Sequence, residues 1–161
     1  MDWQSAPPYV LLGIAIAGAL TALYKRTREP GSDWYRPAWY LLGVSLPFAG
    51  ALGHVVASDR VRSALGWQRD GAGGFQIELA MVLLGFGVVG LAVAMQDDDN
   101  DTKAKTLGAA LGLSLALLAG RHMYELYFGA PDRPGTIAVA CVTDALAASV
   151  LLIGAQDVLI S

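Results

Sequence analysis

The chain has 161 residues, of which 55% are hydrophobic and only 16% are charged, and its mean hydropathy is +0.47. This composition excludes a soluble globular domain and a disordered tail protein, and a single cysteine, Cys141, excludes a disulfide-stapled scaffold. The formal net charge of −3 excludes a nucleic-acid-binding protein, because binding to phosphates requires an excess of basic side chains.

Five apolar stretches follow one another along the chain, and a transmembrane helix needs about 20 such residues. None of them alternates apolar and polar residues with the period of a strand, and helices satisfy their own backbones in lipid. We therefore predict an all-α integral membrane bundle, with the lipid bilayer as its surroundings. The bundle is a single transmembrane domain over residues 1–161, with five helices at about 9–24, 37–57, 75–95, 106–128 and 136–160.

Several residues in these stretches predict how the helices bend and pack. Pro47 lies in the middle of the second stretch and is expected to kink it. Gly108 and Gly112 form a GxxxG motif in the fourth stretch, for which packing within the bundle is favoured over a dimer interface. Aromatic residues near the ends of the stretches are typical of a membrane–water interface. They are Trp3, Trp34, Tyr35, Trp39, Tyr40, Trp67, Tyr124 and Tyr127.

Basic residues in the connections predict the orientation, because cytoplasmic loops carry an excess of lysine and arginine. The first and third connections hold six such residues, and the second and fourth hold four. The amino terminus is therefore predicted outside, and the carboxyl terminus in the cytoplasm, of a multi-pass protein in the cell (inner) membrane. The opening segment MDWQSAPP has no basic residue and does not resemble a cleavable signal peptide.

Ionisable residues within the stretches are predicted to gather at one membrane level. Successive helices alternate in direction, so the ends of the second and fourth and the starts of the third and fifth share one face of the membrane. At 1.5 Å per residue, five side chains lie roughly 5 to 12 Å deep in that leaflet. They are His54, Glu78, His122, Glu125 and Asp144. Ionisable residues within a membrane are costly and are candidates for function, so these five form the predicted ligand or proton site.

Helical spacing places several ionisable residues on shared faces. His122 and Glu125 are three residues apart, while Arg121 and Glu125 are four apart and can form an ion pair. Cys141 and Asp144 share a stripe of the last helix. Supporting roles are predicted for Gln76, Arg121 and Cys141. The alternative interpretation is that such residues cap helices, reach interfacial water, or fix helix register through hydrogen bonds.

Short motifs between Trp39 and Val93 carry a resemblance to a known family. They are Leu42-Gly43, Gly53-His54, Leu65-Gly66-Trp67, Phe75-Gln76-Ile77-Glu78 and the run from Gly85 to Gly90. With Gly120-Arg121-His122 and Asp144 farther on, the chain resembles a family of small prokaryotic polytopic membrane proteins catalogued as a domain of unknown function. Where relatives have Ser-Pro before the Phe-Gln pair, this chain has Gly73-Gly74. The resemblance implies a fold and a set of polar positions, and it implies no activity.

Three function classes fit these observations. In the first, the five polar residues bind a metal ion, protons or a small polar ligand. Imidazole with carboxylate suits a divalent metal such as zinc, iron or manganese, to which Cys141 would add a soft ligand. In the second, His54 and His122 ligate a haem or approach a quinone in a redox subunit.

In the third class, the protein is a structural or accessory subunit of a membrane complex. A second copy of the chain, or another membrane protein, would then bind to its Gly-rich helix faces. Across these classes a metal ion is favoured over a haem. No residue is assigned a catalytic role, so enzymatic activity stays open.

Overall fold

The computed structural model describes residues 6–30, 32–56, 72–95, 101–129 and 134–160, and within these ranges every regular element is a helix. The elements are α1 (Ala6–Arg28), α2 (Tyr35–Trp39), η2 (Tyr40–Ser45), α3 (Leu46–Val56), α5 (Ala72–Ala94), α6 (Asp101–Phe128), α7 (Pro134–Gly154) and α8 (Gln156–Ile160). Because α2, η2 and α3 run on without a break, the described elements make six helices. The predicted all-α fold is confirmed. The motif Leu65-Gly66-Trp67 and residue Trp3 lie outside the described residues.

Four of the described helices are long and apolar enough to cross a membrane. Their candidate spans are Pro8–Arg28, Tyr35–Val55, Ile77–Ala94 and Pro134–Gly154. The sequence predicted five, and α6 is the one that does not qualify, although it is 28 residues long. Its apolar content is lowered by charged and polar side chains near both of its ends: Lys103, Lys105, Arg121, His122 and Glu125. The four candidate spans indicate a multi-pass membrane protein.

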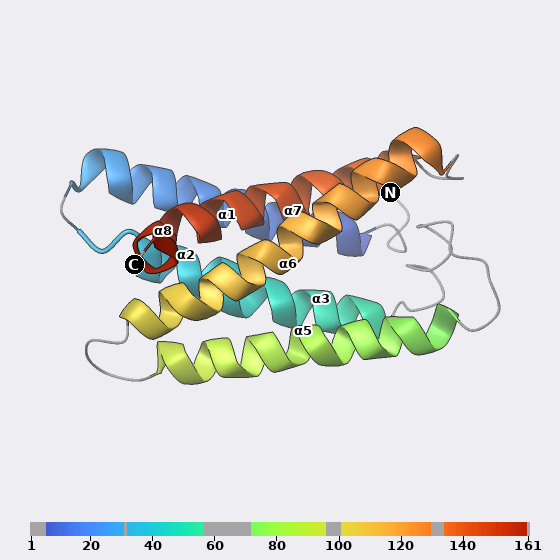
Figure 1. Cartoon of the computed structure of the whole chain (residues 1–161), viewed down its shortest axis with the longest axis horizontal. Helices are drawn as coiled ribbons and strands as arrows, with labels where there is room; N and C mark the ends of the chain where they lie inside the picture. The colour runs from blue at the N-terminus through green and yellow to red at the C-terminus, as the bar shows by residue number, and fades with distance from the viewer. Residues whose placement is uncertain (1–5, 31, 57–71, 96–100, 130–133, 161) are drawn as a thin grey trace.

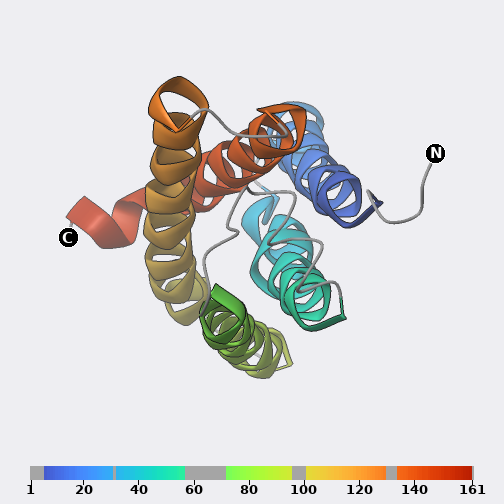
Figure 2. The ribbon, with the colours of Figure 1, turned by 90° about the vertical axis from the view of Figure 1, so that its right-hand side faces the viewer.

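The long helices lie side by side and alternate in direction along the chain (Figure 1). α6 packs mainly on α7, which also contacts α1, while α5 packs on α3 and η2. Seen from one end, α7 lies between α1 and α6, and α3 lies between α1 and α5 (Figure 2). The end of α3, the start of α5, the end of α6 and the start of α7 therefore share one end of the bundle. The amino-terminal part of α1 lies at that end too.

The helix over residues 35–56 changes its winding in the middle. η2 is a π-helical segment of six residues, and Pro47 follows it closely. Proline has no N–H to donate to the preceding turn, so the hydrogen-bond pattern has to change upstream of it. The Ser45 hydroxyl donates to the Tyr40 carbonyl, five residues back, at 2.9 Å. A change of winding is therefore found where the sequence predicted a kink.

α5 packs closely on this π segment, and on Trp39 just before it, through backbone groups of α5. The Trp39 indole Nε1 donates to the Gly90 carbonyl at 3.3 Å, and the Tyr40 hydroxyl donates to the Ala94 carbonyl at 3.0 Å. A side chain at Gly90 would collide with the carbonyl oxygen of Gly43. Glycine is therefore required at position 90 for the two backbones to approach.

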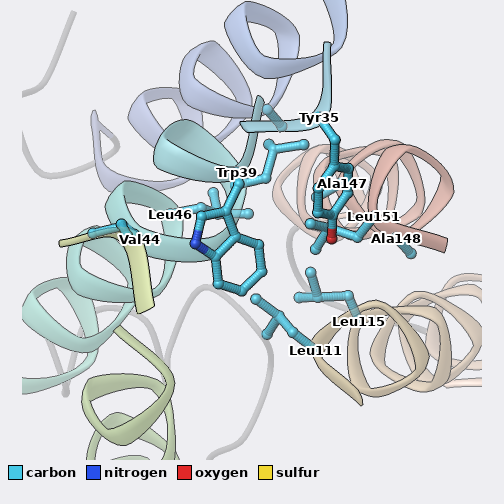
Figure 3. Packing of buried hydrophobic residues seen from close by; sticks show 12 residues of the cluster. Tyr35, Trp39, Val44, Leu46, Leu111, Leu115, Ala147, Ala148 and Leu151 are labelled. Atoms are coloured by element: carbon cyan, nitrogen blue, oxygen red, sulfur yellow. The ribbon is translucent and has the colours of Figure 1, made fainter. Parts of the chain in front are cut away.

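Trp39 lies at the centre of the buried core. Its side chain is 1% exposed, and its indole is directed toward Leu111 of α6 (Figure 3). The sequence placed Trp39 and Tyr35 in an interfacial aromatic belt, and for these two residues that prediction is wrong. Both rings turn inward because the helices that face them carry small residues. Tyr124 and Tyr127, at the end of α6, are exposed as an interfacial residue would be.

Glycines on α6 and α7 make room for the inward side chains. Gly108 and Gly154 lie against the ring of Tyr35, and a side chain at either position would collide with it. Gly112 faces Leu152 of α7, and a methyl group on Gly112 would lie only 2.9 Å from Cγ of Leu152. The GxxxG motif therefore serves packing within the bundle, as predicted.

The last predicted helix, 136–160, is divided in the structure, so that boundary was wrong. α7 ends at Gly154, beside the Tyr35 ring, and α8 begins at Gln156 in a new direction (Figure 2). The turn brings α8 into contact with α6. There Lys105 Nζ donates to Asp157 Oδ2 at 2.8 Å, and this hydrogen bond lowers the pKa of the Asp157 carboxyl below its ordinary value.

Candidate functional site

His122 lies inside the bundle because of its register on α6. Leu111, Leu115 and Ala119 precede it at helical spacing and are all buried against neighbouring helices. Side chains three, four and seven residues apart share a face of a helix, so His122 continues this buried stripe and is only 7% exposed. The buried face of α6 thus carries aliphatic side chains up to Ala119 and an imidazole, that of His122, toward the carboxyl end of the helix.

α7 brings a carboxylate to His122. Nε2 of His122 lies 3.5 Å from Oδ2 of Asp144. One turn earlier on α7, the Cys141 thiol donates to the carbonyl of Ala119 at 3.5 Å. Cys141 and Asp144 therefore both face α6, which follows from their three-residue spacing.

Glu125 lies on the other side of the His122 ring. Its Oε2 is 3.9 Å from Nδ1 of His122, which is too long for a hydrogen bond, and this buried Nδ1 has no hydrogen-bond partner in the part of the chain that the structure describes. Oε1 of Glu125 forms an ion pair with Arg121 at 2.6 Å. Because the Arg121 side chain is 53% exposed, the series Arg121, Glu125, His122, Asp144 leads from the surface of the bundle into its interior.

A cavity of about 130 Å³ lies beside the His122–Asp144 pair. Most of its wall is apolar and comes from α1, α3, α5, α6 and α7. The polar side chains in the wall are His54, His122, Thr136, Thr143 and Asp144. On α6 the lining residues run from Leu111 through Leu115 and Leu118 to His122. The cavity is therefore apolar in the middle of the bundle and polar toward one end.

The predicted site residues occupy different positions around this cavity. His54, His122 and Asp144 line it, while Glu125 stands behind His122 and pairs with Arg121. Glu78 is exposed on α5 and is not part of the lining. Three residues were predicted to support the site, and Arg121 is the one that pairs with Glu125. Cys141 is buried without lining the cavity, and the side chain of Gln76 lies outside what the structure describes.

A family model matches almost the whole chain. It covers residues 5–156 and is that of DUF6790, a family of unknown function. The chain belongs to the DUF6790 family. The resemblance to a family of unknown function, stated from the sequence motifs, is thereby confirmed at that level. No curated protein and no solved structure matches the chain.

The described residues of this DUF6790 member do not form the set of ligands that the metal interpretation requires. Among the described residues, no group of three or more His, Cys, Asp and Glu side chains could hold a metal ion. The predicted set does not come together, because Glu78 is exposed on α5 and Glu125 is paired with Arg121. For the haem interpretation, His54 and His122 line the same cavity, whose volume is about 130 Å³.

Sequence reasoning missed the cavity of the DUF6790 chain and two of its polar lining residues, Thr136 and Thr143. Thr143 is 3% exposed, and its hydroxyl donates to the Val139 carbonyl at 2.8 Å. Its position next to Asp144 was a signal, and so was the leucine spacing that leads to His122 on α6. Gly50 and Gly53 line the cavity from α3 without side chains, and a side chain on Gly50 would meet Leu83. Which glycines face a void is decided by helix packing, and a single sequence does not report it.

Proposed function

We propose that this protein binds a small molecule inside its membrane domain. The apolar body of the molecule lies among the leucines of the cavity, and its polar end lies against His122, Asp144 and His54. The observation that carries the proposal is the lining, in which imidazole and carboxylate side chains interrupt an otherwise apolar wall. Sites for small molecules are typically apolar with a few convergent polar groups. An accessory subunit that used these polar residues only to fix helix register would need no void beside them.

The volume of the cavity sets the size of the ligand. An engineered apolar cavity of about 150 Å³ in another protein stays dry and binds benzene. The cavity here, at about 130 Å³, matches one ring or a short branched chain with a polar substituent. A molecule of this kind partitions into lipid and reaches a membrane-embedded site from there.

Within this proposal α6 crosses the bilayer as a fifth span. At 1.5 Å per residue its 28 residues exceed the hydrocarbon core of about 30 Å, and it packs along α7, itself a candidate span. Its buried polar side chains, His122 and Glu125, face neighbouring helices rather than lipid. Five crossings put the two termini on opposite sides, and the distribution of lysine and arginine favours the amino terminus outside.

Filling the cavity tests the proposed function. Leu115 lines the cavity and is 5% exposed, whereas Leu113, two residues earlier on α6, is 51% exposed. Leu115→Phe adds volume inside the cavity, and Leu113→Phe makes the same change on the outside. Small molecules extracted from the purified proteins are identified by mass spectrometry, with thermal unfolding as the check on folding.

We expect the wild type and Leu113→Phe to carry a compound of about the size of a substituted benzene. Leu115→Phe should carry at least about tenfold less of it, which corresponds to a loss of about 1.4 kcal/mol of binding free energy. Equal amounts in the two folded variants would contradict the proposal.

A further inference from the structure

We infer that the ligand is a protonated primary amine with a small apolar body, and that it binds in exchange for a proton held by the His122–Asp144 pair. This inference rests on the proposed function and names the chemical class of its ligand. It follows from the charges around the cavity, from its hydrogen-bonding groups, and from the absence of Phe, Tyr and Trp among its described lining residues.

The charges around the cavity disfavour an anionic ligand. No lysine or arginine occurs among the described residues that line it. Arg121, on the same helix as His122, forms its ion pair with Glu125 and is not part of the lining. Among the described lining residues, a carboxylate or phosphate would therefore face Asp144 with no lysine or arginine beside it.

Asp144 has His122 as its one charged partner in the described part of the chain. Within the described ranges, the other ionisable groups around the pair are Arg121 and Glu125 on α6, which form an ion pair, Cys141 on α7, and His54 on α3. The described lining residues of α1 and α5 are Pro8, Leu11, Leu79 and Leu83, and none of these ionises.

Before the ligand binds, the His122–Asp144 pair holds one proton, because a buried carboxylate without a compensating charge is costly. The proton sits on the imidazole or on the carboxylate, and in both forms the pair is neutral overall. A protonated amine supplies the same positive charge to Asp144. When it binds, the N–H or O–H bond that holds the proton in the pair breaks, and the proton leaves to water. No bond in the ligand breaks, no electron is transferred, and the net charge of the site is unchanged.

The hydrogen-bonding groups of the cavity fit an ammonium group with N–H donors. The carboxylate of Asp144 and a neutral imidazole nitrogen are acceptors. The hydroxyl of Thr143 uses its proton on the Val139 carbonyl, so that toward the cavity it acts only as an acceptor. Quaternary ammonium groups have no N–H and are typically held by the faces of Trp, Tyr or Phe, and none of these three residues occurs among the described lining residues.

The test uses three probes of similar size and different charge: benzylamine, benzyl alcohol and benzoate. Binding to the full chain in lipid nanodiscs is measured by isothermal titration calorimetry near neutral pH. Two buffers with different enthalpies of ionisation give the number of protons released. The variants are Asp144→Asn, which keeps the shape of the side chain and removes its charge, and Asp157→Asn, a matched change on α8 at the other end of the bundle.

We expect the wild type to bind benzylamine about tenfold or more tightly than benzyl alcohol. It should release about one proton for each benzylamine bound, and it should not bind benzoate. In Asp144→Asn the preference for the amine and the proton release should disappear while binding of benzyl alcohol remains. Asp157→Asn should behave as the wild type.

Equal affinities of the wild type for benzylamine and benzyl alcohol would overturn the inference and leave the proposed function standing. Preference for the amine in folded Asp144→Asn would overturn the assignment of Asp144. If that variant does not fold, the proton count of the wild type still decides, since amine binding without proton release overturns the exchange. A failure of all three probes to bind the folded wild type would overturn the proposed function and the inference together.

Discussion

His122 and Asp144 depend on each other at the residue scale. His122 is 7% exposed, and its two ring nitrogens face carboxylates of Asp144 and Glu125. Removal of one member of a buried charged pair leaves the other with an uncompensated charge, which costs more than the pair itself contributes. The two side chains should therefore act as one unit in stability measurements.

A double-mutant cycle measures this dependence. We expect His122→Ala and Asp144→Ala each to destabilise the protein, and the double variant to lose less than the two losses added together. The coupling free energy should be about 0.5–3 kcal/mol, as for residues in direct contact. The measurement is reversible unfolding in mixed detergent micelles. A cycle between His122 and the distant Asp157 is the control, and additive losses in both cycles would argue against the pair.

At the element scale, α5 approaches the helix over residues 35–56 closely at Trp39 and Gly43. This approach combines the hydrogen bond from Trp39 to the Gly90 carbonyl with the contact between Gly90 and the Gly43 carbonyl oxygen. The atom that a new side chain would meet belongs to the backbone and cannot rotate away. A substitution at Gly90 therefore has to move a whole helix.

Two glycines of α5 allow a matched test. Gly90→Ala should lower the free energy of unfolding by about 1–3 kcal/mol, because it overpacks the contact with η2. Gly85→Ala, on the same helix with nothing within 4 Å of the new methyl group, should leave it unchanged or raise it by up to about 1 kcal/mol. Thermal and detergent-induced unfolding of the two variants give the comparison. Equal effects would mean that helix propensity, and not the contact, decides.

The helices themselves could be predicted from the sequence, because long apolar runs leave few other structures in lipid. Their interruptions could be predicted only in part. Pro47 marked the place of η2, since a missing N–H is visible in the sequence. The break after Gly154 lies against the ring of Tyr35, a residue more than 100 positions away, and no local signal reports that contact. Contacts of this kind are set by packing, and they override local propensity.

At the scale of the whole molecule, alternation of the helices explains why part of the candidate site could be predicted. His54, His122 and Asp144 come to one end of the bundle because successive helices run in opposite directions. Depth along a helix could be read from the sequence, but rotation about its axis could not. Glu78 lies near the start of α5 and is exposed, and Trp39, predicted at an interface, points into the core.

The proposed orientation places the amino terminus outside and both the end of α1 and the carboxyl terminus in the cytoplasm. A reporter that is active only in the cytoplasm should therefore be active when it is fused after Arg28, at the end of α1, and also when it is fused after Ile160. Both results follow from an amino terminus outside and five crossings, with α6 among them. A cytoplasmic reporter after Arg28 with an external one after Ile160 would show that α6 does not cross.

The π segment has a further consequence for how the chain tolerates changes in length. A π turn takes up one residue more than an α turn. Side chains after η2 therefore face directions that an α-helical wheel, at about 100° per residue, would assign to the residue before them. Loss of one residue inside Tyr40–Ser45 would restore ordinary winding and leave Trp39 and His54 on their present sides. Loss of one residue inside α3 would instead turn His54 by about 100°, out of the cavity. The wide turn thus sets the rotation of the half of the helix that lines the cavity relative to the half that packs in the core.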